Sequence, residues 1–263
     1  MAWLACVVSV IRLKPISLVD ISWDKIIVLD KFHQFLKKLQ FIHVGKCGGS
    51  TIVDLLHKSP VVREEYSEIL ISHVCGVRVD PSFDFLICLR NPISRANSAF
   101  SWRNKLVVLD ALPDQRKRFP GEYDVLTRYG SMDKMGSRLY RDAGSKLDQF
   151  VARDFNLIHH LRESISFYLE PLRDVLAKGN VFGVICQESL SEDCEKILGL
   201  SSGDLFVRRN EKKSSTTSLS EACIVNLRKY LRQDYVCIID LWTKGIISDQ
   251  KLSQLIFDPP FFP

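Results

Sequence analysis

Residues 45–51, Gly-Lys-Cys-Gly-Gly-Ser-Thr, carry the groups needed to hold a phosphate within one short stretch. Glycines let the backbone turn tightly, so that successive N–H groups can point at one anion. Lys46 adds a full positive charge, and Ser50 and Thr51 add hydroxyl donors. The following helix adds the partial positive charge of its amino terminus. The stretch predicts a phosphate-binding loop, with a glycine-rich turn that holds no ligand as the alternative.

The loop only partly matches that of nucleotide triphosphatases, Gly-x-x-x-x-Gly-Lys-Ser/Thr. Cys47 stands where a serine or threonine must bind magnesium, and Gln40 stands where the first glycine belongs. The lysine also precedes the glycine pair instead of ending the loop. These departures argue against a P-loop small-molecule kinase or ATPase, which is kept as an alternative.

A second anion-binding group follows the apolar run 83–89 and begins with Arg90-Asn91-Pro92. A guanidinium can bind a terminal phosphate through two parallel hydrogen bonds. Ser98, one to two turns into the helix expected to follow, can reach the same phosphate. Arg95 lies between them and can instead form a salt bridge within the fold.

Together the two motifs resemble those of sulfotransferases that use 3′-phosphoadenosine 5′-phosphosulfate (PAPS). Residues 42–51 are similar to the 5′-phosphosulfate loop of the carbohydrate branch, which includes heparan sulfate 2-O- and 6-O-sulfotransferases and bacterial relatives. Residues 90–98 resemble the Arg-Asp-Pro site for the 3′-phosphate in the same family. A weaker likeness, in the apolar run 181–186 and the basic residues after it, extends the resemblance over about residues 40–245.

The resemblance implies a sulfuryl transfer from PAPS to a hydroxyl or amine of a small molecule or carbohydrate, with 3′,5′-ADP as the product and no metal. In that family the loop holds the 5′-phosphosulfate, and the arginine with the later serine holds the 3′-phosphate. A Lys/Arg-rich loop, here with Lys212 and Lys213, lies near the 3′-phosphate. The implied nucleotide-binding residues are Lys46, Cys47, Gly48, Gly49, Ser50, Thr51, Arg90, Ser98, Arg208 and Arg209.

Three positions depart from the family pattern. Cys47 replaces a threonine that helps to hold the 5′-phosphate, Asn91 replaces an aspartate, and Gly45 replaces a proline. We expect these changes to tune donor affinity without abolishing it. A non-catalytic relative that binds a nucleotide or glycan is a further alternative, although intact Lys46, Arg90, Ser98 and His73 argue against it.

The expected catalytic residues are Lys46, beside the leaving oxygen, and a histidine base. His73 matches in position the base of the 2-O-sulfotransferases, so the resemblance assigns that role to it. His43 and His57 fall on a strand and a helix end and are interpreted as structural. His159 and His160 fall in an expected helix, where neighbours point to different faces and cannot easily share one metal ion.

Alternating strands and helices predict an α/β fold, a parallel β-sheet flanked by helices, which the resemblance specifies as the P-loop-like sulfotransferase fold. Strands are expected at 40–44, 83–89 and 181–186, and one near the amino terminus. Helices are expected at 30–39, 52–58, 92–103, 146–178, 190–198 and, capped by Ser218 and Glu221, 218–244. Residues 104–145, rich in charge, Gly and Pro, predict an acceptor-side loop region. The whole of 1–263 is expected to be a single domain.

Composition restricts the remaining possibilities. The chain has 263 residues, 46% hydrophobic and 25% charged, and a net charge of +5, too mild for a dedicated nucleic-acid binder. Its eight cysteines form no Cys-x-x-Cys pair, which argues against a zinc ribbon. The apolar stretch 1–11 is too short for a membrane span. We expect a cytoplasmic protein, with a Golgi-lumen enzyme as the alternative; the sequence does not specify an oligomeric state.

Overall fold

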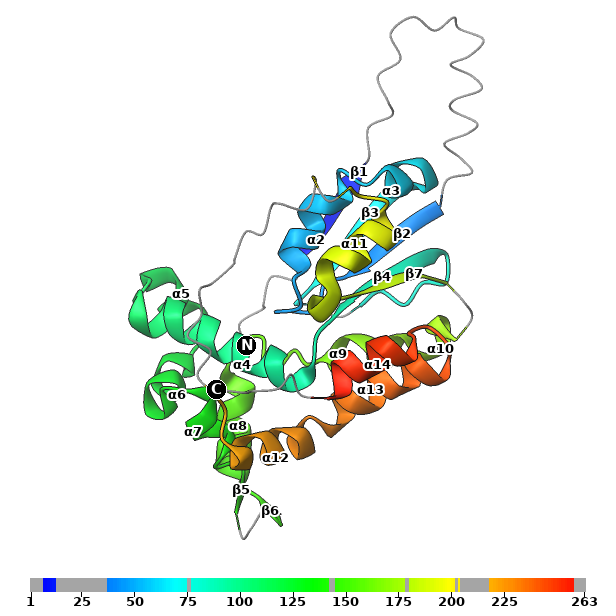
Figure 1. Cartoon of the computed structure of the whole chain (residues 1–263). Helices are drawn as coiled ribbons and strands as arrows, with labels where there is room; N and C mark the ends of the chain where they lie inside the picture. The colour runs from blue at the N-terminus through cyan, green and yellow to red at the C-terminus, as the bar shows by residue number, and fades with distance from the viewer. Residues whose placement is uncertain are drawn as a thin grey trace, which may run out of the picture. The chain divides into compact units, whose positions relative to one another are not determined.

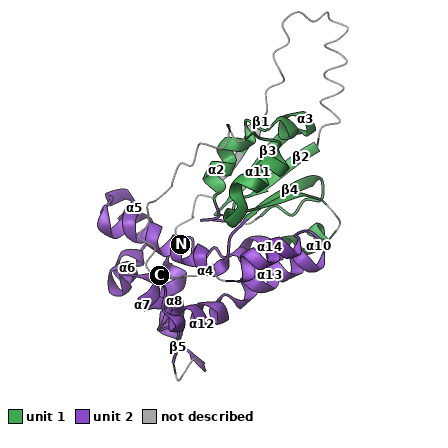
Figure 2. Cartoon of the chain, in the orientation of Figure 1, with its two compact units in different colours: residues 1–43, 48–88, 171–210 green, residues 44–47, 89–170, 211–263 purple. Residues whose placement is uncertain are grey.

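The computed structural model describes residues 7–12, 37–74, 77–141, 145–177, 180–201, 203 and 218–257. These residues form two compact units, shown in different colours in Figure 2. Unit 1 comprises residues 1–43, 48–88 and 171–210, and unit 2 comprises residues 44–47, 89–170 and 211–263. Each unit is therefore assembled from distant parts of the sequence.

Unit 1 has α/β architecture and is built on a five-stranded sheet in the order β1-β3-β2-β4-β7. The central strand β2 pairs in parallel with β3 and with β4, whereas the edge strand β1 is antiparallel to β3. The strands are β1 (Val7–Arg12), β2 (Lys37–Ile42), β3 (Tyr66–His73), β4 (Phe83–Leu89) and β7 (Val181–Cys186). Four consecutive residues of β2 are fully buried, as is typical of a central parallel strand.

Helices α2 (Gly49–Leu56), α3 (Pro60–Glu65) and α11 (Leu190–Leu198) lie together on one face of this sheet (Figure 1). Gly199, with φ 64°, ends α11 in the left-handed conformation that favours glycine. The short segments α10 (Arg173–Leu176) and η3 (Gln187–Ser189) flank β7 in sequence. The predicted α/β character, a mostly parallel sheet with flanking helices, is confirmed.

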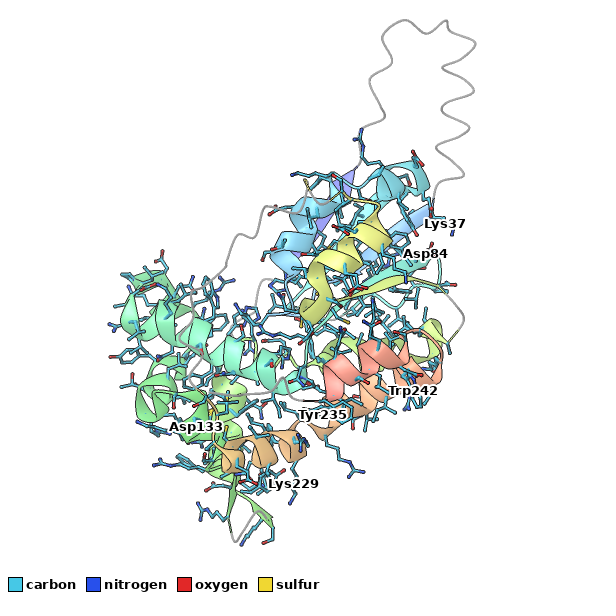
Figure 3. All side chains as sticks on the ribbon, in the orientation of Figure 1. Lys37, Asp84, Asp133, Lys229, Tyr235 and Trp242 are labelled. Carbon is cyan, nitrogen blue, oxygen red and sulfur yellow. The ribbon has the colours of Figure 1, made fainter. Side chains whose placement is uncertain are left out.

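The amino-terminal edge of the sheet is tied by polar contacts. Lys37 and Asp84, labelled in Figure 3, begin the neighbouring strands β2 and β4, and their charged groups lie 3.1 Å apart. Tyr66 of β3 donates a hydrogen bond of 2.9 Å to the same carboxylate. Together these contacts span three adjacent strands. The loops that follow β2 and β4 lie at the opposite, carboxyl-terminal edge of the sheet.

Unit 2 is helical apart from a two-stranded hairpin. Its first helix, α4 (Pro92–Asn104), continues into one turn of π-helix, η1 (Lys105–Leu109). Its other elements are α5 (Pro113–Arg118), α6 (Glu122–Tyr129), α7 (Met132–Gly136), β5 (Tyr140–Arg141), β6 (Lys146–Leu147), α8 (Gln149–Leu157), α9 (Ile165–Leu169), α12 (Glu221–Tyr230), α13 (Arg232–Thr243) and α14 (Asp249–Ile256). Apolar side chains from α4, α6, α7, α8 and α12 share its core.

Residues 104–145 differ from the expected loop region, because helices occupy most of them. Val125, Leu126 and Met135 of this segment are buried in the core of unit 2. Its Pro113 and Gly121 stand at the start of helices, as N1 and N-cap residues, where they support helix formation instead of interrupting it. An acceptor-side role for the segment stays a prediction.

Two other element predictions were wrong in part. Residues 37–39, expected to end a helix, begin β2. The helix expected after residue 218 begins with Ser220 as its cap, and it breaks at Leu231 into α12 and α13. Asp133, labelled in Figure 3, fixes that cap by accepting hydrogen bonds from the backbone N–H and hydroxyl of Ser220.

No helix in the described ranges is long and apolar enough to cross a membrane.

Candidate functional site

The expected phosphate loop joins β2 to α2. Lys46 has φ 71° and Gly48 has φ 81°, so two residues of the loop adopt left-handed backbone conformations, which are uncommon for a lysine. Turns of this kind can direct successive N–H groups to one side and bind anions. Cys47 is fully buried, its N–H bonds to the carbonyl of Val44 at 3.3 Å, and its thiol faces the carbonyl of Gly45 at 3.9 Å. Both donor groups of Cys47 are therefore engaged inside the protein.

The two glycines of the loop are each needed for packing. A Cβ atom on Gly48 would lie 2.3 Å from Oε1 of Gln187, and its positive φ strains any other residue. A Cβ atom on Gly49 would lie 1.9 Å from the ring of His43. Packing therefore explains why both positions are glycine, independently of any ligand. The sequence did not predict this packing role.

The start of α2 has the properties of an anion site. No side chain caps it, and its first turn contains no acidic residue. The first N–H groups of a helix lack partners within the helix and carry a partial positive charge. Ser50 in this turn is exposed and Thr51 is half-buried, so both hydroxyls are available near the helix terminus.

Within unit 2, Lys46 and Arg90 come together. Nη1 of Arg90 donates a hydrogen bond of 3.4 Å to the backbone oxygen of Lys46. Nζ of Lys46 lies 4.5 Å from the centroid of the Trp102 ring, in a cation–π contact. Both side chains are half-buried, and Ser98, in the second turn of α4, is half-buried as well. The two sequence motifs therefore meet where Arg90 contacts the backbone of Lys46.

Asn91 shapes the corner between β4 and α4. Its Oδ1 accepts hydrogen bonds of 3.0 Å from the N–H groups of Ile93 and Ser94, which caps the helix. Its Nδ2 donates to the carbonyl of Leu255 at 3.0 Å, and Pro92 occupies the first helical position. This capping turn fixes where the chain leaves Arg90.

Arg95 is a structural residue. Its side chain is fully buried, and Nη1 donates to the carbonyls of His160 at 2.7 Å and Glu163 at 3.2 Å. Its Nη2 lies 4.0 Å from Oδ2 of Asp234. These contacts agree with the expectation that Arg95 can form a salt bridge within the fold instead of binding phosphate.

His73, the expected base, is the last residue of β3 in unit 1. Its ring stacks on that of His43, with centroids 3.9 Å apart, and its Nδ1 lies 3.0 Å from the carbonyl oxygen of His43. The ring of His43 in turn covers the α-carbon of Gly49. A continuous set of contacts therefore links His73 to the start of α2.

The prediction that His159 and His160 lie in a helix was wrong. Helix α8 ends at Leu157, and both histidines lie in the turn that follows it, where His160 has φ 68°. Their rings are 4.0 Å apart, so they lie side by side instead of on different helix faces.

The basic residues Arg208, Arg209, Lys212 and Lys213 fall outside the described residues. Two further residues contact the loop, Gln187 within unit 1 and Trp102 within unit 2. The sequence did not predict them, because neither forms part of a local pattern. His43 was interpreted as structural, but the sequence did not predict that its ring packs against Gly49.

No family model matches the chain, and neither a curated protein nor a solved structure matches it.

Proposed function

We propose that this protein is a PAPS-dependent sulfotransferase of the P-loop-like fold. The observation that carries the proposal is the hydrogen bond between Arg90 and the backbone of Lys46, because it joins the charged residues of two motifs that are 44 positions apart. The strands β2 and β4, which lead into these motifs, are parallel neighbours, so their carboxyl ends share one edge of the sheet. Ligands of open α/β sheets bind at that edge.

The proposed roles follow the anion-binding groups. Lys46 and residues 48–51 hold the 5′-phosphosulfate, through the lysine charge, the uncapped N–H groups of α2 and two hydroxyls. Arg90 and Ser98 hold the 3′-phosphate, since a guanidinium forms paired hydrogen bonds with phosphate oxygens.

Sulfuryl transfer needs a base, an aligned acceptor and stabilisation of the leaving oxygen. The acceptor oxygen or nitrogen forms a bond to sulfur while the bond from sulfur to the 5′-phosphate oxygen breaks, which releases 3′,5′-ADP. His73 takes the acceptor proton, and Lys46 stabilises the negative charge that develops on the departing oxygen. No redox partner is needed for this balance.

The hydrogen bond to His43 specifies which nitrogen of His73 is the base. A carbonyl oxygen can only accept, so Nδ1 of His73 carries the proton in this contact. Nε2 is therefore the basic nitrogen, and stacking on the His43 ring fixes its direction. A histidine held in one tautomer in this way is prepared for general-base catalysis.

The first test is nucleotide binding by the whole chain, measured by calorimetry and by thermal unfolding. 3′,5′-ADP should bind and raise the unfolding temperature, whereas 5′-AMP, which lacks only the 3′-phosphate, should bind more weakly. Preference for magnesium–ATP with no response to 3′,5′-ADP would instead support the P-loop kinase or ATPase. Incubation with PAPS and a panel of hydroxyl and amine acceptors, small molecules and carbohydrates, should yield products heavier by one sulfuryl group; nucleotide binding without such products would support the non-catalytic relative.

A further inference from the structure

The turn after α8 gathers three potential metal ligands, His159, His160 and Glu163, in the interior of unit 2. Each is at least nine-tenths buried. One ligand atom from each residue can be chosen so that all three lie within 4.8 Å of one another. None of the three has a role in the proposed sulfuryl transfer.

The backbone of this turn explains how neighbouring histidines come together. The carboxylates Glu122 and Glu163 accept hydrogen bonds from the backbone N–H groups of His159, at 2.9 Å, and His160, at 2.7 Å. The left-handed conformation of His160 brings its ring beside that of His159, with centroids 4.0 Å apart. A helix would have pointed the two rings in different directions.

The spacing of one pair of ligand atoms fits a tetrahedral ion. Nδ1 of His159 lies 3.4 Å from Oε2 of Glu163. Zinc bonds of about 2.0–2.1 Å at tetrahedral angles put two ligand atoms roughly 3.3–3.4 Å apart. The widest separation, at most 4.8 Å, has to shorten by about 1.4 Å to reach the same value, which a histidine ring rotation can supply.

The surroundings prepare these groups for coordination. The 3.4 Å separation is long for a hydrogen bond, and within the described residues Nδ1 of His159 forms no other. Nε of Arg162 donates to the other oxygen of Glu163, as groups behind a metal ligand commonly do.

The main rival is a simple ion pair between a protonated His159 and Glu163. Arg95, Arg103 and Arg162 border this region and oppose a cation, whereas Glu122, Glu163 and Asp234 favour it. The formal charges of these six side chains cancel. A neutral pair of imidazoles with one carboxylate is the donor set that zinc and similar divalent ions accept.

We propose that His159, His160 and Glu163 bind one divalent transition-metal ion, such as Zn²⁺ or Co²⁺, with a fourth position filled by water. The ion links three residues of the turn 158–163 that follows α8. The ion has no step in the sulfuryl transfer, although the ring of His160 packs against Gly45 of the proposed phosphate loop.

The test uses the untagged full chain after chelator treatment, titrated with Co²⁺ by absorption and with Zn²⁺ by calorimetry. One equivalent should bind, with the visible spectrum of a four-coordinate ion and no thiolate band. Losing a hydrogen bond to a metal ligand costs roughly 10- to 100-fold in affinity, so His159→Gln should cost more than about 100-fold. His57→Gln, at the exposed end of α2, is the matched control and should bind like the parent chain.

Equal binding by the parent chain and a folded His159→Gln variant, as judged by circular dichroism, overturns the site, and so does the absence of binding by the parent chain. If the variant does not fold, X-ray absorption on the zinc-loaded parent chain decides. Two imidazoles and oxygen around the ion support the proposal. Sulfur ligands would place the ion at cysteines, of which six lie in the described residues, and would reject it.

Discussion

The guanidinium of Arg90 lies against the main chain of Lys46, with Nη1 3.4 Å from the carbonyl oxygen. The bond uses the backbone of the lysine, so its ammonium group remains able to approach a second anion. It also uses only one of the five N–H donors of the arginine. The contact therefore positions Arg90 without exhausting its capacity to bind phosphate.

Substituting Arg90 should weaken nucleotide binding selectively. Arg90→Ala removes a charged hydrogen-bond donor, which is worth about 1.5–3 kcal/mol, so calorimetry should show 3′,5′-ADP binding weakened roughly 10- to 100-fold. 5′-AMP, which lacks only the 3′-phosphate, should lose little. Arg63→Ala, an exposed arginine of α3, is the control. Equal losses for both nucleotides would remove Arg90 from the 3′-phosphate site.

Replacing His73 should impair the chemical step alone. A general base typically contributes 10²–10⁴-fold in rate, so His73→Ala should lower kcat by about that factor while 3′,5′-ADP affinity changes by less than about threefold. Steady-state kinetics with the acceptor found by mass spectrometry measures this split. His57→Ala should retain parental turnover, and parental turnover in His73→Ala would contradict the assignment.

The sequence predicted those parts of the fold whose signals are local. β4, β7 and α11 have the predicted bounds, because mostly apolar runs mark the two strands and a terminal glycine marks the helix. Residues 104–145 were mispredicted because Pro and Gly were interpreted as breaking helices, whereas they begin them. Burial of Val125 and Met135 depends on partners far along the chain, including α12, which a local pattern cannot show.

The candidate site divides in the same way. That Lys46 and Arg90 would be close follows from two apolar strands that each end in a charged motif. The stack of His73 on His43, and the contact of Gln187 with Gly48, depend on side-chain directions set by the folded sheet. The position of His160 could not be predicted, because its positive φ is held by tertiary contacts such as Arg95 to its carbonyl.

A methyl group added at Gly49 should destabilise unit 1. Gly49→Ala places a Cβ 1.9 Å from the His43 ring, and such overpacking costs about 1–3 kcal/mol. Urea unfolding should show this loss, and a smaller one when His43→Ala is also present. Gly203→Ala is the control, since a Cβ there meets nothing closer than 3.7 Å. A loss that is equal with and without the His43 ring would disprove this explanation.

The ion pair of Arg103 and Glu122 should be sensitive to removal of one partner. Both are buried, with bonds of 2.9 and 2.6 Å to the two carboxylate oxygens. Removing one member of a buried pair costs about 3–5 kcal/mol, so Glu122→Ala should lower the free energy of unfolding by that amount. Asp110→Ala breaks an exposed pair with Lys105 and should cost less than about 1 kcal/mol. Similar losses of unfolding free energy in both variants would contradict the larger contribution of the buried pair.

Two thiols should resist alkylation. Burial, with a smaller effect of nearby Asp193 or Asp133, raises the pKa of Cys194 and of Cys223 to about 12. Only thiolates react readily, so iodoacetamide at pH 8 should label the half-buried Cys237 before Cys194 and Cys223, as peptide mass spectrometry can show. Unfolded thiols ionise near pH 8.5, so these two groups should lower stability as pH rises from about 8.5 to 12. Early labelling of Cys194 would contradict their burial.

The capping corner at Asn91 depends on both ends of the amide side chain. An aspartate there would still accept the two N–H bonds of α4, but it would turn a carboxylate toward the Leu255 carbonyl, to which the amide now donates. Asparagine is the residue that satisfies both neighbours. The amide of Asn91 therefore ties α14 to the start of α4, and Asn91→Asp should loosen α14.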